Sequence, residues 1–278
     1  MKTGFLNIDK DEGVSSAYVV NRVKRLTRTA CGHLGTLDPL ACGVLPVGVG
    51  NATRLFDYFL DKTKRYSARF RFGVTTDTLD REGQPHGEGR IPSGQEIAAA
   101  LPRFQGEIDQ IPPLYSAKSV NGRRGYELAR AGETFTLPPK RVRVDEFRLL
   151  GQTGEDEFAF EIVCGGGTYI RSLARDLAEA CGTVGYMSYL CRTQSGAFTL
   201  QNAVKLSELT EKNWESYLIP TPSVLPFPVL ESPDPRIFHG VRCPTDAADG
   251  EYLVYCDGEF YGTACVSAGT VKIGKKLC

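Results

Sequence analysis

Prolines place the strongest limit on how this chain can fold. Six of its 16 prolines lie between Pro220 and Pro235. Because proline fixes φ and lacks an amide hydrogen, this stretch excludes a helix and predicts a stiff connector. We therefore expect one domain at residues 1–220, a connector at 221–235 and a small domain at 236–278. In the small domain, Asp257-Gly258 between two apolar runs predicts a β-hairpin with a two-residue turn.

The first domain mixes helix and strand signals. Tyr66, Ala68, Phe70 and Phe72 alternate with more polar residues, which predicts a strand with one apolar face. The other expected elements are a strand at 5–8, a helix at 19–26 after a Ser-Ser cap, a helix from a Ser93–Glu96 capping box through Leu101, a strand at 158–164, and a helix that is capped by Thr168 and stops at Gly182. The sequence shows no regular strand-helix-strand repeat, so the pattern alone indicates a mixed α and β domain.

Composition narrows the classes of function. The charges of the 33 basic and 33 acidic residues cancel, which argues against a protein that coats nucleic acid through its overall charge. Any RNA contact must therefore be local. The nine cysteines contain no Cys-x-x-Cys and there are only three histidines, so we expect reduced thiols in the cytoplasm rather than disulfides or a metal site. Residues 1–13 lack an apolar run of signal-sequence length. No apolar run elsewhere in the sequence is long enough to span a membrane.

Asp38 lies in a glycine-rich segment, Gly-His-Leu-Gly-Thr-Leu-Asp-Pro-Leu-Ala-Cys-Gly-Val-Leu, at residues 32–45. The glycines permit unusual dihedral angles and close approach of a ligand, and Pro39 favours an extended conformation of Asp38. The segment could thus present an acid from a rigid, apolar turn. An isolated Asp-Pro pair is more often a turn that hydrogen-bonds its own backbone, so the dipeptide alone does not assign a function.

Four more segments carry distinctive motifs. They are Asp-Lys-Thr-Lys-Arg-Tyr at 61–66, Thr-Asp-Thr-Leu-Asp-Arg-Glu-Gly at 76–83, Ile-Pro-Pro-Leu-Tyr-Ser-Ala-Lys at 111–118, and Gly-Thr-Tyr-Ile-Arg-Ser-Leu-Ala-Arg-Asp-Leu at 167–177. Together with the Asp38 segment, and in this order, they resemble the motifs of the TruB family of tRNA pseudouridine synthases. The resemblance covers residues 3–205, roughly, and five ordered motifs make a chance match negligible.

The resemblance implies a fold and a reaction. The fold is α+β, a pseudouridine synthase catalytic domain at 1–220 with a mixed, largely antiparallel sheet flanked by helices, followed by a small PUA-like β domain at 236–278. The reaction is isomerisation of uridine-55 in the T loop of tRNA by a monomeric cytoplasmic enzyme without cofactor or metal. The bond between C1′ and N1 breaks, the base turns, and C5 joins C1′.

The resemblance also implies three catalytic residues. Asp38 attacks or assists at C1′, Arg171 pairs with Asp38 and keeps it ionised, and Tyr66 stacks on the extruded uracil and helps to deprotonate C5. The residues by themselves leave other roles open. Tyr66 also fits the core face of its strand, and Arg171 also fits a solvated helix surface.

The resemblance also implies that three further residues hold the RNA. His33 would rearrange the nucleotides around the flipped uridine, Leu190 would close one side of the base pocket, and Lys64 would contact the substrate. Leu190 fits a core position nearly as well. Extruding the uridine from the folded tRNA costs free energy that stacking and pocket contacts must recover.

A basic segment matches the family's mobile thumb-like insertion, at about residues 115–143. Its basic residues are Lys118, Arg123, Arg124, Arg130, Lys140, Arg141 and Arg143, against the acids Glu127 and Glu133. We expect Lys118, Arg123, Arg124, Arg130 and Arg141 to contact RNA, with affinity that falls as salt rises. A solvated protein face is the ordinary alternative for such a run of charge.

The sequence departs from the family pattern at a few positions. Asp11 stands in place of a usual proline, Leu34 and Cys42 in place of the commoner threonines near Asp38, and Cys191 in place of a usual arginine. The last change removes one positive charge that the family pattern would place at an RNA contact.

Two other classes of function remain open from the sequence. A non-catalytic tRNA-folding chaperone could use the same surface, and it would tolerate the loss of Asp38. A carboxylate-based nucleoside or glycoside hydrolase would need a second positioned acid and would release free uracil.

Overall fold

A computed structural model describes residues 2–116, 119–120, 123–131, 133, 135–231 and 234–277, with the backbone alone described at 119, 120, 124, 126, 129 and 130. Within these residues, none of the helices has the length and apolar character that crossing a lipid bilayer requires.

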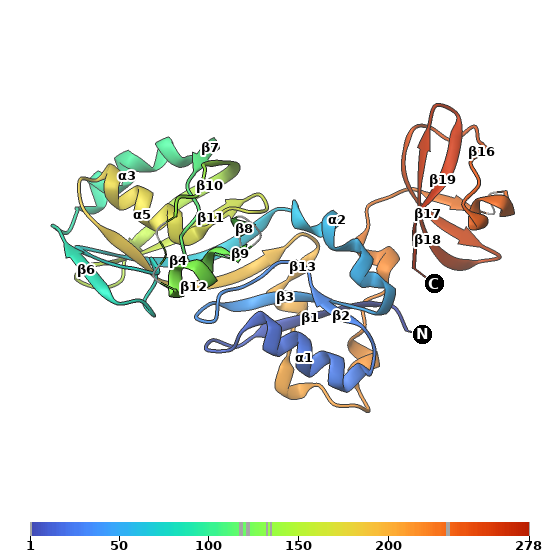
Figure 1. Ribbon diagram of the computed structural model, residues 1–278, viewed down its shortest axis with the longest axis horizontal. Helices are drawn as coiled ribbons and strands as arrows, with labels where there is room; N and C mark the ends of the chain where they lie inside the picture. Colours follow the sequence, from blue (N-terminus) through green and yellow to red (C-terminus); the bar gives the residue numbers. More distant parts are fainter. Residues whose placement is uncertain are drawn as a thin grey trace.

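One ten-stranded sheet organises the first 205 residues (Figure 1). Its main path runs through β14 (Val204–Lys205), β1 (Gly4–Lys10), β3 (Cys42–Val49), β12 (Gly185–Ser195), β4 (Lys64–Phe72), β11 (Glu157–Cys164), β10 (Lys140–Gln152) and β7 (Gly106–Gln110). Two short strands join at its sides, β2 (Cys31–His33) against β3 and β13 (Phe198–Thr199) against β12. The pairs β1–β14 and β3–β12 are parallel and the other pairs of this sheet are antiparallel.

β3 and β12 meet along a short parallel ladder, which we call the seam. It consists of two residue pairs, Cys42 with Cys191 and Gly43 with Arg192. Gly43 has φ of +94°, and a Cβ atom there would lie 2.3 Å from the carbonyl oxygen of Arg192, so only glycine permits this approach. The seam joins the half of the sheet that contains β1 and β3 to the half that contains β4 and β11.

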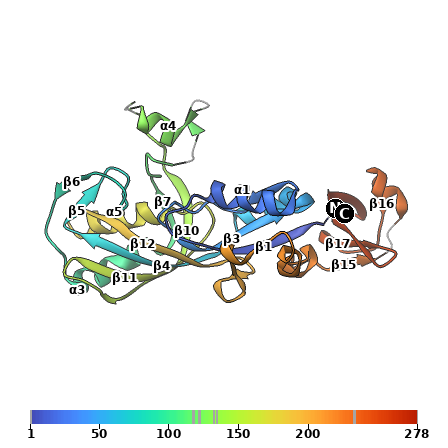
Figure 2. The same cartoon turned by 90° about the horizontal axis from the view of Figure 1, so that it is seen from below.

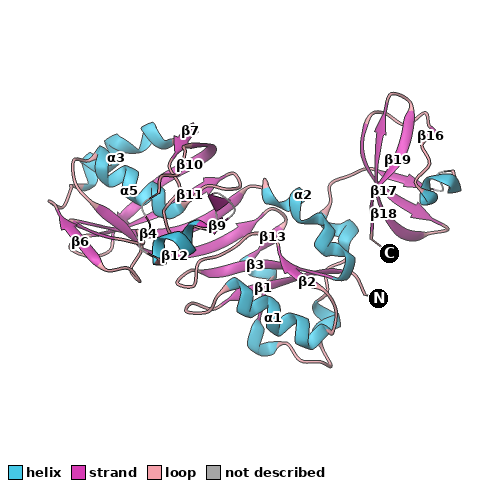
Figure 3. Cartoon of the chain, viewed as in Figure 1, coloured by secondary structure: helices cyan, strands magenta, loops and turns pink. Residues whose placement is uncertain are grey.

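Helices cover one face of the sheet on both sides of the seam. α1 (Ser16–Thr27) packs on the first half, and α3 (Gly94–Ala100) and α5 (Ile170–Ala180) pack on the second half, in one continuous apolar core. Figure 3 shows how few and short the helices are among the strands. The expected strands at 5–8, 66–72 and 158–164 and the expected helices after Ser15 and Ser93 are all confirmed.

The expected cap of α5 is wrong. Tyr169, not Thr168, is the residue before the first helical turn, and it makes no side-chain cap. The Thr168 hydroxyl instead donates a hydrogen bond of 3.1 Å to the carbonyl oxygen of Gly165. The threonine therefore stabilises the turn that leads into the helix, a role that sequence spacing does not distinguish from capping.

Shorter elements connect or project from this body. The remaining helices are α2 (Phe56–Leu60) and α4 (Gly125–Arg130), and two small hairpins pair β5 (Val74–Thr76) with β6 (Pro85–Glu88) and β8 (Ser119–Val120) with β9 (Arg123–Arg124). The 3₁₀ helices are η1 (Gly50–Leu55), η2 (Leu101–Phe104), η3 (Leu200–Asn202), η4 (Leu206–Glu208), η5 (Trp214–Tyr217), η6 (Thr221–Val224) and η7 (Pro235–His239). Figure 2 shows that α4 stands away from the body of the molecule.

The C-terminal unit is a five-stranded sheet with the order β15 (Val229–Glu231), β17 (Gly250–Cys256), β18 (Glu259–Ser267), β19 (Thr270–Lys276) and β16 (Cys243–Pro244). The hairpin expected around Asp257-Gly258 is confirmed, and both turn residues have positive φ. The sheet is larger than the single hairpin that the sequence signals. Its strand β15 lies inside the stretch expected to be connector only, because three residues between prolines can still pair as a parallel edge strand.

Candidate active site

A cavity of about 530 Å³ opens on the helical face of the sheet, beside the seam. Its walls come from the loop before β3, the end of α2, the strands β4 and β12, the segment after β5, the segment before α4, and the start of α5. Among its lining residues are Gly35, Thr36, Asp38, Lys64, Tyr66, Thr78, Asp80, Glu82, Tyr115, Arg171, Leu190 and Arg192. This volume lies within the range of pockets that bind small organic ligands.

The loop that carries Asp38 is held from α1. The buried Ser16 hydroxyl accepts a hydrogen bond of 2.9 Å from the amide of Leu37 and donates one of 2.8 Å to the Leu37 carbonyl oxygen. The amide of Gly13 donates to the carbonyl oxygen of Pro39 at 2.8 Å, and the Ala41 amide donates to the Asp38 carbonyl oxygen at 3.1 Å. These hydrogen bonds fix the backbone on both sides of Asp38.

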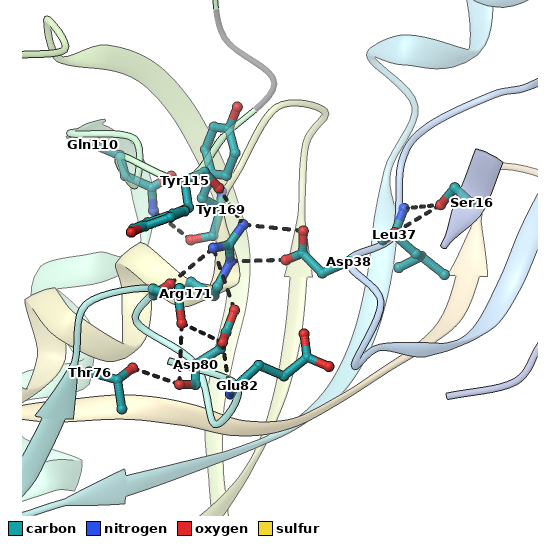
Figure 4. A network of polar contacts seen from close by, with 11 residues as sticks. Ser16, Leu37, Asp38, Thr76, Asp80, Glu82, Gln110, Tyr115, Tyr169 and Arg171 are labelled. Carbon is teal, nitrogen blue, oxygen red and sulfur yellow. Dashed lines mark hydrogen bonds and ion pairs between the residues drawn. The ribbon is translucent and has the colours of Figure 1, made fainter. Parts of the chain in front are cut away.

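Asp38 and Arg171 form a bidentate ion pair in this cavity (Figure 4). Arg171 Nε lies 2.9 Å from Asp38 Oδ2, and the second nitrogen, NH2, donates to Oδ1 at 3.2 Å. The Asp38 side chain is 32% exposed whereas that of Arg171 is 7% exposed, so the carboxylate remains reachable while the guanidinium does not. The two residues lie 133 positions apart in the sequence, and the fold brings them together.

Arg171 is itself fixed by three further groups. NH1 donates to the carbonyl oxygen of Thr78 at 2.9 Å, and NH2 donates to that of Tyr115 at 3.0 Å. NH1 also lies 3.5 Å from Oδ2 of Asp80, a carboxyl whose side chain is only 7% exposed. Burial raises the pKa of Asp80, while the Thr78 hydroxyl, at 2.6 Å, and Arg171 act against this rise. Sequence reasoning missed Asp80, although its motif at 76–83 was a signal.

The start of α5 is anchored independently of the ion pair. The side-chain amide of the buried Gln110 donates to the carbonyl oxygen of Tyr169 at 3.1 Å and accepts from the Tyr169 amide at 2.8 Å. The Ser172 hydroxyl donates to the carbonyl oxygen of Ile111 at 2.8 Å. These bonds fix the backbone from which Arg171 projects, so the guanidinium needs little reorganisation to hold a charge.

Tyr66 and Leu190 form the floor of the cavity. Both are buried, at 6% and 5% exposure, and both line it, so each is a core residue and a cavity residue at once. Burial raises the pKa of Tyr66 to about 12, so its hydroxyl is protonated near neutral pH. Tyr66 therefore offers the cavity a neutral hydroxyl rather than a phenolate base.

Arg192 supports the Asp38 loop from β12, a role that no sequence motif indicates. Its fully buried guanidinium donates to the carbonyl oxygens of Val44 at 2.7 Å and Gly35 at 3.0 Å, and lies 3.4 Å from that of Thr36. Next to it, Lys64 is buried and donates to the carbonyl oxygens of Leu60 and Lys62. Burial lowers the pKa of Lys64 to about 8, with the Arg192 charge acting in the same direction.

Comparison with known proteins identifies the family of this chain. A model of the N-terminal domain of TruB family pseudouridylate synthases matches residues 23–170, and a model of the C-terminal domain of tRNA pseudouridylate synthase B matches residues 171–225. The chain belongs to the TruB family. It is therefore a tRNA pseudouridine synthase, an isomerase that acts in tRNA processing.

Curated relatives agree with this family. Proteins named tRNA pseudouridine synthase B from Gluconacetobacter diazotrophicus and Rhodospirillum rubrum are 46% and 47% identical to this chain, over 74% and 73% of it and 68% and 67% of their own length. Another, from Caldanaerobacter subterraneus, is 38% identical over 82% of this chain and 80% of its own. A crystal structure of a Cbf5–Nop10–Gar1 complex contains the same fold, with a TM-score of 0.73 at 24% identity over 99% of this chain and 85% of that one. The expected α+β pseudouridine synthase fold is thus confirmed.

The residues expected to touch RNA lie in several places in this TruB-family chain. His33, on β2, is half-buried and does not line the cavity; burial lowers its pKa. Arg123 pairs with Glu133 at 2.7 Å, and Arg141 pairs with Glu107 and Asp109, all on the surface. Lys118 and the side chains of Arg124 and Arg130 lie outside the described residues.

Proposed function

We propose that the enzyme converts uridine-55 in the T loop of tRNA to pseudouridine, with Asp38 as the carboxylate that acts at C1′. The observation that supports this most is the bidentate pair of a half-exposed Asp38 with a buried Arg171 at the wall of a cavity of about 530 Å³. Family membership supports a tRNA substrate, and the resemblance of the five motifs supports the T-loop uridine.

The reaction needs few groups from the protein. Asp38 attacks C1′, or stabilises positive charge there, as the bond to N1 breaks; the freed base turns, C5 bonds to C1′, and the proton on C5 leaves while N1 gains one. Arg171 holds Asp38 and its negative charge in position throughout. Tyr66 and Leu190 enclose the uracil from below and keep it from diffusing away, which favours isomerisation over loss of the base.

The enzyme would act as a monomer, and the rest of its chain would hold the tRNA. Residues 1–220 form the catalytic domain, and the insertion at about 115–143, which carries the projecting α4, folds over the RNA as a thumb. Residues 221–235, which include the edge strand β15 of the C-terminal sheet, connect to a small PUA-like domain at 236–278 that contacts the acceptor end. The free-energy cost of extruding the uridine would be offset by stacking of the uracil in the cavity.

The experiment that tests this proposal is tritium release from tRNA labelled at C5 of uridine, with a parallel assay for free uracil. The wild type should release tritium and no uracil. Asp38→Asn keeps the shape of the side chain and should lower the rate by at least about 10³-fold while tRNA affinity is retained. Appreciable turnover by purified Asp38→Asn would refute the assignment, and release of uracil by the wild type would point to a hydrolase instead.

A further inference from the structure

Two cysteines face each other across the seam. Cys42 is the first residue of β3, and its register partner on the parallel strand β12 is Cys191. Adjacent strands lie roughly 4.8 Å apart. This spacing falls within the Cα separation of about 4.4–6.8 Å that a disulfide spans. Both residues are free thiols here.

The thiols lie on the face of the sheet away from the cavity. Leu190 and Arg192 line the cavity, and because side chains alternate along a strand, Cys191 between them points to the opposite face. Cys42 is half-exposed and Cys191 is 8% exposed. A small reagent can therefore reach Cys42 from solvent more easily than it can reach Cys191.

The surroundings of Cys42 favour its thiolate. The hydroxyl of Tyr189 lies 3.6 Å from Cys42 Sγ, within reach of a hydrogen bond to the sulfur. Hydrogen bonding from Cys191 is the largest influence on the Cys42 pKa and lowers it to about 6, with Tyr189 acting in the same direction and burial and the charges of Asp9 and Glu12 acting against it. The same interaction raises the pKa of Cys191, because the second thiol of a close pair ionises against the charge of the first.

We propose that Cys42 and Cys191 form an oxidisable dithiol, a modification site at which peroxides install a reversible disulfide across the seam. The Cys42 thiolate attacks one peroxide oxygen and displaces the other as hydroxide, which leaves a sulfenic acid on Cys42. The sulfur of Cys191 then attacks the Cys42 sulfur, its proton leaves, and hydroxide departs. In sum two thiols and one hydrogen peroxide give one disulfide and two waters, with two electrons passing to the peroxide.

The disulfide would tie together the two halves of the sheet at their narrow junction. One half carries the Asp38 loop ahead of β3, and the other carries Tyr66 and Leu190. Two ladder pairs join them at the seam, so a covalent link there adds a constraint that the reduced protein lacks. The site does not touch the catalytic residues, and the proposal does not depend on the reaction that they perform.

The test uses hydrogen peroxide on the purified full chain, followed by alkylation and mass spectrometry. We expect the loss of two alkylatable thiols, a mass lower by two hydrogens before alkylation, and a linked peptide pair joining Cys42 to Cys191. Dithiothreitol should restore both thiols. Digestion before Asp38 isolates Cys42 from Cys31, and digestion after Tyr186 isolates Cys191 from Cys181, so the link can be assigned.

Variants provide the controls. Cys42→Ser should abolish the linked peptide and leave Cys191 alkylatable, while Cys31→Ser should leave the link intact. Cys31 is a matched control because it is also half-buried at the start of a strand beside β3, yet burial raises its pKa. The proposal is overturned if peroxide oxidises other cysteines while Cys42 and Cys191 both stay alkylatable, or if Cys42 stops at a sulfenic acid that dimedone traps beside a free Cys191.

Discussion

Arg171 determines the geometry of the site at the scale of single residues. Its guanidinium bonds to Asp38 through two nitrogens and also donates to two backbone carbonyl oxygens. The carboxyl group of Asp80 is a second acidic partner of the same guanidinium. A lysine can supply the charge but not this planar set of donors. Asp38 thus owes its orientation to a residue that solvent hardly reaches.

We predict that Arg171→Lys lowers the rate of the chemical step by about 10²-fold while tRNA affinity stays within a few-fold, because preorganised charge is lost and RNA contacts are not. Single-turnover rates and filter binding measure the two quantities. Equal losses in both would instead make Arg171 an RNA contact. Arg171→Met is a poorer test, since it leaves Asp80 buried without its partner and should destabilise the fold by about 3–5 kcal/mol.

A substitution at Tyr66 can distinguish a role in packing from a role in catalysis. Its ring lies in the core and at the cavity floor, so Tyr66→Phe keeps the packing and removes only the buried hydroxyl. We expect a lower single-turnover rate with an unchanged melting temperature. A lower melting temperature at full rate would assign Tyr66 to the core alone.

At the scale of elements, α1 positions the catalytic loop through one hydroxyl. Ser16 satisfies both backbone groups of Leu37, next to Asp38, and its neighbour Ser15 caps the same helix by accepting from the Tyr18 amide at 3.1 Å. We predict that Ser16→Ala lowers both stability, by about 1–3 kcal/mol, and the catalytic rate, because the loop loses its anchor.

Ser15→Ala is the matched control for this prediction. It should cost about 1 kcal/mol through the lost cap and leave the rate unchanged, since Ser15 does not touch the loop. Chemical denaturation and single-turnover assays provide the comparison. If both variants lost rate in proportion to stability, the anchor role of Ser16 would be contradicted.

Local signals explain which elements the sequence predicted. The alternation in β4 and the capping box at Ser93 depend on neighbours within a few residues, and both are as expected. The seam, the buried Arg192 and the link from Arg171 to Asp80 join residues far apart in the chain, which no local period encodes. Motif resemblance supplied the pairing of Asp38 with Arg171, but it gave no role to Asp80 or Arg192.

At the scale of the whole molecule, the small C-terminal unit packs onto the first domain. Leu253 and Leu277 share an apolar cluster with Leu55, Phe59 and Val224, on the face of the sheet opposite α1. We predict that a chain ending at Pro228 exposes this cluster, melts at a lower temperature and aggregates in light scattering. A truncated chain that stays monodisperse with an unchanged melting temperature would show that this packing contributes little.

Carbodiimide primer-extension mapping of tRNA, after treatment with the wild type and with Asp38→Asn, measures where pseudouridine forms and whether Asp38 is needed. We predict one strong stop that marks pseudouridine at position 55 with the wild type and none with the variant. A stop at another position, or the same stop with Asp38→Asn, would contradict this prediction.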